Sequence, residues 1–275
     1  ASAVSYNDLT DQYRILNTDA VSMLVSLGII EGKPDGSYAP TENVDRAQMA
    51  KMLSVIMNKG VDNSALYQSV NSGLVDVNTN WATGHINYCY TTGIIAGRGN
   101  GKFDPSATVT ALEAAKMLLV AVGYDPAIEG FEGADWAINV SVRADEQGIF
   151  EGFTKDLSAP LNRDDAALLI YNALDVEMIQ SYTTNNYPIA YSDHRTILAD
   201  KYGVIKVQGV VVANEWASLA SDDGDAALKA GKTTIYNGEG IFSTTGNTHE
   251  RKEDAPLKTQ TFNVSTPVEL LGKTV

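Results

Sequence analysis

The sequence is poor in cysteine, histidine and basic residues, and it lacks a long apolar run. Its single cysteine, Cys89, excludes an intramolecular disulfide and is predicted to be a small core residue. No run of about 18 apolar residues is present, so no membrane-spanning helix is predicted. The three histidines, His85, His194 and His249, are too scattered for a metal site, and His85 is expected at an interface or on the surface.

Positive charge is scarce: 20 Lys and Arg stand against 34 Asp and Glu, for a net charge of −14. Such an acidic chain is poorly suited to nucleic acid, because phosphates require a basic surface. The acidic run at 222–225 lacks the alternation of a calcium-binding loop and is expected to be an exposed turn. No nucleophile elbow, phosphate loop or dinucleotide motif is present, so we predict no catalytic residue, no metal and no cofactor.

What the sequence does contain is a repeat. Three glycine-punctuated stretches, 22–40, 87–105 and 140–160, can be aligned with one another. The aligned residues are Gly28, Gly93 and Gly148, then Gly32, Gly97 and Gly152, and finally Pro40, Pro105 and Pro160. Each stretch leads into apolar residues at helical spacing, so the repeated unit is predicted to be helix, loop, helix.

Capping boxes mark the start of the helix that follows each loop. Asp45 stands three residues before Gln48, and Thr110 three residues before Glu113; Asn162 opens the third copy more loosely. A single unit of this size cannot bury its apolar face alone. The three copies are therefore expected to close around a shared axis or to stack.

These residues resemble a known family. GIIEGKPDGSYAP followed by NVDRAQMAKML is similar to the S-layer homology motif, whose usual form is GII-G-PDG-F-P followed by TRAE-AKML. The resemblance covers roughly residues 8–178. It implies an all-α, three-pronged pseudo-trimer that attaches surface proteins to secondary cell-wall polymers carrying pyruvylated amino sugars.

The resemblance also implies that the arginine of TRAE contacts ligand, and its positions here are Arg46, Ala111 and Arg163. Independently of the family, an arginine at the first turn of a helix favours an anion, and its guanidinium can hold a carboxylate with two hydrogen bonds. The alternative is that both arginines pair with local acids, such as Asp45 or Asp164. Because Ala111 departs from the pattern, at most two full-strength pockets are expected.

Five further residues are candidates for the ligand site. Trp81 and Trp136 align with each other, and their indole rings suit either sugar stacking or packing between repeats. Asp76 is expected to orient an arginine, to bond a sugar hydroxyl or simply to be solvated. Gly36 and Gly101 either let the loop backbone approach a sugar closely or satisfy a tight turn.

The predicted fold class is a multidomain α + β chain. The predicted boundaries are 1–65, 66–125 and 126–180 for three S-layer-homology repeats, 181–200 for a linker that docks onto them, and 201–275 for a small, mostly β segment. Strands are expected in the β-branched runs that begin at Val204, Thr233 and Thr259. The strand-like end of the sequence suggests that this segment continues in the full-length protein.

The leading functional hypothesis is a non-enzymatic anchor. A secreted bacterial surface protein would bind the cell wall non-covalently through a secondary cell-wall polysaccharide or another peptidoglycan-linked polymer. One alternative is an S-layer lattice protein that self-assembles. Another is the N-terminal anchor of a surface enzyme whose catalytic domain lies beyond residue 275.

Overall fold

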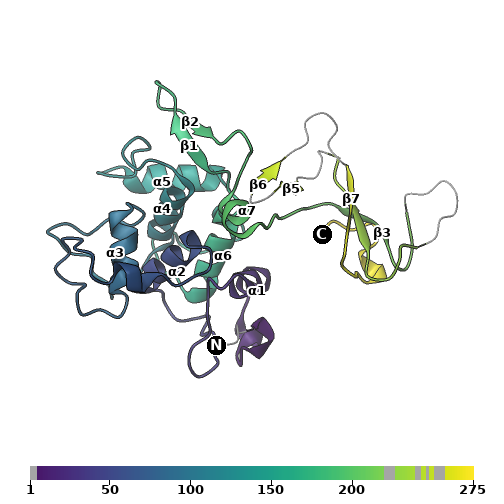
Figure 1. The fold of residues 1–275 in the computed structure, drawn as a ribbon, viewed down its shortest axis with the longest axis horizontal. Helices are drawn as coiled ribbons and strands as arrows, with labels where there is room; N and C mark the ends of the chain where they lie inside the picture. The colour runs from purple at the N-terminus through teal and green to yellow at the C-terminus, as the bar shows by residue number, and fades with distance from the viewer. Residues whose placement is uncertain (1–4, 220–226, 239–242, 246–247, 251–257) are drawn as a thin grey trace. The chain divides into compact units, whose positions relative to one another are not determined.

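A computed structural model of the chain describes residues 5–219, 227–238, 243–245, 248–250 and 258–275, and the acidic run at 222–225 lies outside them. The fold in this part of the chain is mixed, with seven α-helices and small antiparallel sheets (Figure 1). The chain divides into two compact units. The first comprises Ala1–Tyr191 and Thr196–Tyr202, and the second comprises Ser192–Arg195 and Gly203–Val275.

The first unit is built from pairs of short helices joined by loops. Its α-helices are α1 (Thr18–Ser26), α2 (Arg46–Met57), α3 (Thr83–Thr91), α4 (Ala111–Val122), α5 (Trp136–Glu146), α6 (Arg163–Ala173) and α7 (Ile197–Tyr202). Three 3-10 turns accompany them: η1 (Tyr6–Asp8), η2 (Gln12–Arg14) and η3 (Ser64–Tyr67). Each repeat thus supplies a first helix (α1, α3 or α5), a loop and a second helix (α2, α4 or α6).

The ends of these helices follow the signals in the sequence. Asp45 and Thr110 begin α2 and α4 with complete capping boxes, and the side chain of Asn162 caps α6. The first helices stop at glycines in the left-handed region, with φ of 72° at Gly28, 80° at Gly93 and 71° at Gly148. The predicted helix-loop-helix unit is therefore present three times.

The three units close on one another in a cycle. Each second helix packs against the first helix of another repeat, α2 with α3, α4 with α5, and α6 with α1. The backbone repeats this order just before the second helices. The Val44 N–H donates to the carbonyl of Leu161 at 2.8 Å, Leu161 to that of Val109 at 2.8 Å, and Val109 to that of Val44 at 2.9 Å. Each unit thereby covers the apolar face that another leaves open.

The same hydrogen-bond pattern corrects one part of the repeat alignment. The N–H groups of Ala47 and Asp164 donate to the carbonyls of Pro105 and Pro40, whereas that of Leu112 donates to Leu157. Leu157, and not Pro160, is therefore equivalent to the other two prolines. The reason is a shorter third loop: eight residues separate Gly32 from Pro40, but only five separate Gly152 from Leu157.

The core of the first unit is continuous through all three repeats. Leu53, Leu119 and Ile170, one from each second helix, are fully buried. Cys89 is also fully buried, which confirms its prediction as a core residue. His85 is 4% exposed between α2 and α3, where its Nδ1 lies 2.5 Å from the Ser54 hydroxyl, so it is an interface residue.

Residues 181–200, expected to form a linker, contribute to regular structure. β1 (Ile179–Tyr182) and β2 (Pro188–Ala190) form an antiparallel hairpin, and α7 follows. The Tyr182 hydroxyl donates to Glu129 at 3.0 Å, and the Leu198 N–H donates to the carbonyl of Leu174 at 2.9 Å. The hairpin and α7 are therefore each hydrogen-bonded to the third repeat.

The second unit contains the expected strands. β3 (Val210–Asn214), β4 (Thr233–Tyr236) and β7 (Thr259–Phe262) form an antiparallel sheet in the order β3-β4-β7, while β5 (Ser243–Thr245) pairs with β6 (Thr248–Glu250). A 3-10 turn, η4 (Val268–Leu270), follows β7. Val211 and Ile235 form the small buried core of this sheet. Across both units, the helices that the structure describes are all too short or too polar to cross a membrane.

Candidate ligand-binding cavities

Arg46 is the first residue of α2 and is only 4% exposed. Its Nε donates to the carbonyl of Phe103 at 2.7 Å and its Nη2 to that of Ala96 at 2.6 Å. The guanidinium carbon lies 4.5 Å from the centre of the Phe103 ring, a cation–π arrangement. Arg46 therefore reaches from the first repeat into the loop of the second and holds that loop at two points.

Arg163 makes the equivalent contacts from α6 to the first loop. Its Nε donates to the carbonyl of Tyr38 at 2.7 Å, and its Nη2 to that of Glu31 at 3.2 Å. The guanidinium lies 4.8 Å from the centre of the Tyr38 ring, and the Tyr38 hydroxyl donates to the backbone carbonyl of Arg163 at 2.7 Å. Both arginines therefore bridge two repeats.

Neither arginine pairs with the acids considered as its alternative partners. Asp45 is the helix cap of α2, and Asp164 accepts hydrogen bonds from the N–H groups of Leu16 and Asn17. Burial, together with the nearby charge of Arg98, lowers the pKa of Arg46 to about 10. Arg46 is still a cation at neutral pH, and it is one held largely out of water without a carboxylate partner in the described chain.

Asp76 stabilises the loop to which Arg46 donates its hydrogen bonds. Its carboxylate accepts hydrogen bonds from the N–H groups of Phe103, at 2.9 Å, and Asp104, at 2.8 Å. The backbone of Asp104 is left-handed, with φ of 56°, so the carboxylate secures a strained residue. Because the same Phe103 accepts the Nε hydrogen of Arg46, Asp76 positions the arginine through the backbone.

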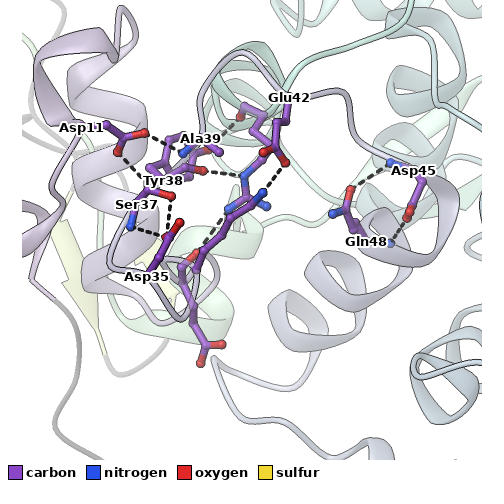
Figure 2. Close-up of polar contacts among 11 residues, drawn as sticks. Asp11, Asp35, Ser37, Tyr38, Ala39, Glu42, Asp45 and Gln48 are labelled. Atoms are coloured by element: carbon purple, nitrogen blue, oxygen red, sulfur yellow. Dashed lines mark hydrogen bonds and ion pairs between the residues drawn. The ribbon is translucent and has the colours of Figure 1, made fainter.

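Asp11 does the same in the first repeat, as Figure 2 shows. Its two carboxylate oxygens accept from the N–H groups of Tyr38, at 2.7 Å, and Ala39, at 2.9 Å. Ala39 has φ of 55°. The third repeat has Phe131 at this position and the shorter loop, so the acid and the segment it supports are absent together.

Gly36 and Gly101 lie at tight turns with φ of 83° and 69°. Their carbonyls accept from the N–H groups of Thr10, at 3.0 Å, and Val75, at 2.8 Å. Neither glycine lines the cavities described below. Their positions therefore favour the turn requirement over close approach to a sugar.

Two cavities lie where one repeat meets another, and each brings a helix-start arginine, Arg46 or Arg163, together with one tryptophan. The Arg163 cavity, of about 220 Å³, is lined by Ile29, Ile30, Glu31, Gly32, Lys33, Pro34, Gln48, Lys51, Met52, Trp81 and Arg163. The Arg46 cavity, of about 410 Å³, is lined by Arg46, Ile94, Ile95, Ala96, Gly97, Arg98, Glu113, Lys116, Met117, Phe131, Glu132, Gly133 and Trp136. Trp81 is 61% exposed, and Trp136 is half-buried. The structure thus brings each arginine together with a tryptophan from a different repeat.

The two cavities are built from equivalent positions. Lys51 and Lys116 lie on α2 and α4, each five residues after the start of its helix, and each lines its cavity. Sequence reasoning did not single out these lysines, although they stand at the repeat offset of 65 residues that aligns the first two repeats. They add a further cation to each cavity, beside Arg46 and Arg98 in one and beside Arg163 and Lys33 in the other.

The third junction, between α6 and α1, lacks these groups. Ala111 replaces the arginine, Leu16 the tryptophan and Leu168 the lysine. Lys155, in the shortened loop, forms an ion pair with Asp165. Ala111 comes from the second repeat and Leu16 from the first, and the cyclic packing places both at this one junction.

Chemically, the two complete cavities suit an anionic sugar. The arginine and lysine provide donors for a carboxylate, and the indole provides an apolar face for a pyranose ring. In the described residues, Nη1 of neither arginine donates a hydrogen bond to the protein, so a donor edge is available to a ligand. No cluster of metal-ligating side chains occurs in the part of the chain that the structure describes.

Comparison with known proteins finds one family model and several relatives named as surface proteins or surface-layer proteins. The S-layer homology domain matches residues 9–50 and 75–115. A cell surface protein of Thermoanaerobacter kivui is 26% identical over 245 residues, 89% of this chain and 29% of its own length. An S-layer protein of Bacillus licheniformis is 32% identical over 112 residues, 41% of this chain and 12% of its own. The exoglucanase XynX of Acetivibrio thermocellus is 29% identical over 188 residues, which are 63% of this chain and 16% of its own length. The chain thus spans less than a third of each of these relatives.

Proposed function

We propose that this chain, which carries S-layer homology domains and is similar to secreted, cell-wall-associated surface proteins, anchors its protein to the wall through a secondary cell-wall polysaccharide. The ligand is an anionic segment of that polymer, with a pyruvylated amino sugar as its recognised unit. Binding occurs in the Arg46 and Arg163 cavities and is non-covalent. The three helix-loop-helix units act together as an all-α pseudo-trimer, because each cavity requires residues from different repeats.

One observation supports this proposal most strongly: arginine and tryptophan occur together at two junctions and are lost together at the third. Core packing alone would not require this, because Trp81 is 61% exposed at the Arg163 cavity. A ligand that contacts both groups explains why they accompany each other. In this proposal Trp81 and Trp136 stack on sugar rings while Arg163 and Arg46 bind carboxylates.

The charge of the protein limits how this binding works. With a net charge of −14, the chain as a whole repels an anionic polymer at long range. At physiological ionic strength, however, charges are screened over about 8 Å. The cations that line each cavity therefore act locally, and affinity comes from contacts within the cavities and not from electrostatic attraction at a distance.

Sedimentation with purified cell walls tests the proposal. The chain should pellet with intact walls and stay in solution with walls whose polymer has been removed by mild acid. The variant Trp81→Ala/Trp136→Ala should bind at least about tenfold more weakly, because stacking on an aromatic ring contributes on the order of 1 kcal/mol per site or more. Trp216→Ala, which alters an exposed tryptophan in the second unit, is the matched control. Equal binding to stripped walls would contradict polymer recognition.

The role of the anchored protein is a separate proposal. The T. kivui and B. licheniformis relatives are named as surface-layer or cell surface proteins, while XynX is an exoglucanase. We infer that the present chain is the non-catalytic, wall-binding part in either setting. A longer chain that assembles into sheets at rising concentration would support lattice assembly, and glycan hydrolysis by it would support an anchored enzyme.

A further inference from the structure

We propose that Glu31 weakens the Arg163 cavity by holding Lys51, so that the two cavities bind the same anionic sugar with unequal affinity. The inference rests on the proposed function, because it concerns the ligand preference of the same cavities. It assigns a specificity-determining role to one residue of the first loop. The Arg46 cavity, which has no equivalent acid, is then the stronger site for a carboxylate.

The geometry of the Arg163 cavity places Glu31 among its cations. A carboxylate oxygen of Glu31 lies 3.1 Å from Nζ of Lys51, and both residues line the cavity. The backbone carbonyl of Glu31 also accepts a hydrogen bond from Arg163. The other lysine of this cavity, Lys33, pairs with Glu42. Both lysines of this cavity therefore already have an acidic partner from the protein.

The Arg46 cavity differs at the corresponding position, where Ala96 replaces Glu31. Lys116, equivalent to Lys51, has no ion pair in the described residues and lies 6.0 Å from the Trp136 ring centre. Burial lowers the pKa of Lys116, an effect that the charge of Glu132 partly offsets. Glu113, the other acid lining this cavity, pairs with Arg98 at 2.9 Å. Among the described residues, neither Arg46 nor Lys116 forms an ion pair with a carboxylate.

A ligand carboxylate meets different conditions in the two cavities. In the Arg46 cavity it meets a Lys116 that forms no ion pair in the described residues, although the charge of Glu132 acts on that lysine. In the Arg163 cavity it must displace Glu31 from Lys51 or accept repulsion from that acid. Because the Glu31–Lys51 pair is largely exposed, with side chains 66% and 35% accessible, the difference is modest, about two- to fivefold in affinity. A neutral sugar should not distinguish the cavities on this basis.

The three tryptophans allow the two cavities to be measured separately in the intact chain. Trp81 lines the Arg163 cavity, Trp136 lines the Arg46 cavity, and Trp216 lies in the second unit. In ¹⁵N-labelled protein each indole N–H gives its own resonance, assigned by single Trp→Phe variants. Titration with the methyl glycoside of a pyruvylated N-acetylhexosamine should shift the Trp136 signal at lower concentration than the Trp81 signal, while Trp216 stays unchanged.

Two reciprocal variants test the role of Glu31. Glu31→Gln should strengthen binding at Trp81 by about two- to fivefold without altering the midpoint at Trp136. Ala96→Glu, at an exposed position, should weaken binding at Trp136 by a similar factor. Glu151→Gln is the matched control, because it removes the same charge at the equivalent position of the third loop, beside the junction that lacks an arginine.

The outcomes separate the inference from the function on which it rests. If Trp81 and Trp136 respond to the glycoside but Glu31→Gln leaves the Trp81 midpoint unchanged, the role of Glu31 is refuted and sugar binding stands. A wild-type titration in which Trp81 responds at lower concentration than Trp136 also refutes it. If neither indole responds in any variant, both the proposed function and the inference fail.

Discussion

Replacing Arg46 by lysine keeps the positive charge but removes the hydrogen-bonding and stacking geometry of the guanidinium. Lysine keeps a cation but offers a single ammonium in place of the planar guanidinium. The ammonium can bond either the Phe103 or the Ala96 carbonyl, whereas arginine bonds both, at 2.7 and 2.6 Å. The stacking on Phe103, at 4.5 Å, is weakened as well.

The expected decrease in the free energy of unfolding follows from the lost hydrogen bond and the weakened stacking. A hydrogen bond to a charged group contributes about 1.5–3 kcal/mol, and a cation–π contact about 0.5–2 kcal/mol depending on its exposure. Arg46→Lys should therefore lower the free energy of unfolding of the first unit by about 2–4 kcal/mol. In a unit of this size, that corresponds to a fall in Tm of roughly 5–15 °C.

Arg163→Lys provides the internal comparison. Arg163 is half-buried, and its second hydrogen bond, to Glu31, is longer at 3.2 Å. Its replacement should lower the free energy of unfolding by only about 1–2 kcal/mol. Urea unfolding followed by circular dichroism at 222 nm reports on the helical first unit. A variant Arg46→Lys as stable as the wild type, or less affected than Arg163→Lys, would refute the bridging role of the guanidinium.

Three further predictions concern buried or loop-supporting groups. Burial alone would raise the pKa of Asp76, but the N–H donors of Asp104 and Phe103 hold it below its usual range. Asp76 therefore stabilises the fold above about pH 4. This contribution disappears as acid protonates the carboxylate in the folded state. Asp76→Asn should show a smaller loss of urea stability between pH 5 and pH 3 than the wild type, and identical profiles would contradict this. Burial lowers the pKa of His85, against the opposing charge of Asp62, so the folded state favours neutral imidazole. Stability should be complete above about pH 6.5 and decrease below it, and His85→Asn should remove that decrease from the urea midpoint. Burial strongly raises the pKa of the Cys89 thiol, so native protein should not react with a disulfide reagent that labels it promptly in urea; prompt native labelling would show that the α2–α3 interface opens.

The elements of the first unit could be predicted because their signals are local. Capping residues such as Asp45 and Thr110, and stop glycines such as Gly28, determine the backbone within a few residues of themselves. The roles of Arg46 and Asp76 were harder to predict, since their partners, Phe103 and Ala96, are 27 residues or more away in the sequence.

The composition of the cavities depended on packing that no local pattern encodes. Sequence comparison assigned each irregularity to a repeat, but cavities form between repeats, and the cyclic order decides which residues meet. Lys116 illustrates this, because only the structure places it beside Trp136 and Arg46 in a single cavity. The alignment of Pro160 failed for a related reason: the three-residue deletion in the third loop becomes visible only in the hydrogen bonds of Leu157.

A crystal of the chain soaked with the methyl glycoside of a pyruvylated N-acetylhexosamine tests the central claim most directly. We expect ligand density in two cavities, with the carboxylate beside Arg46 and Arg163 and the ring against Trp136 and Trp81, and none at the junction beside Ala111. Density at Ala111 would contradict the account. Empty Arg46 and Arg163 cavities would also contradict it, provided that both cavities are open to solvent in the crystal.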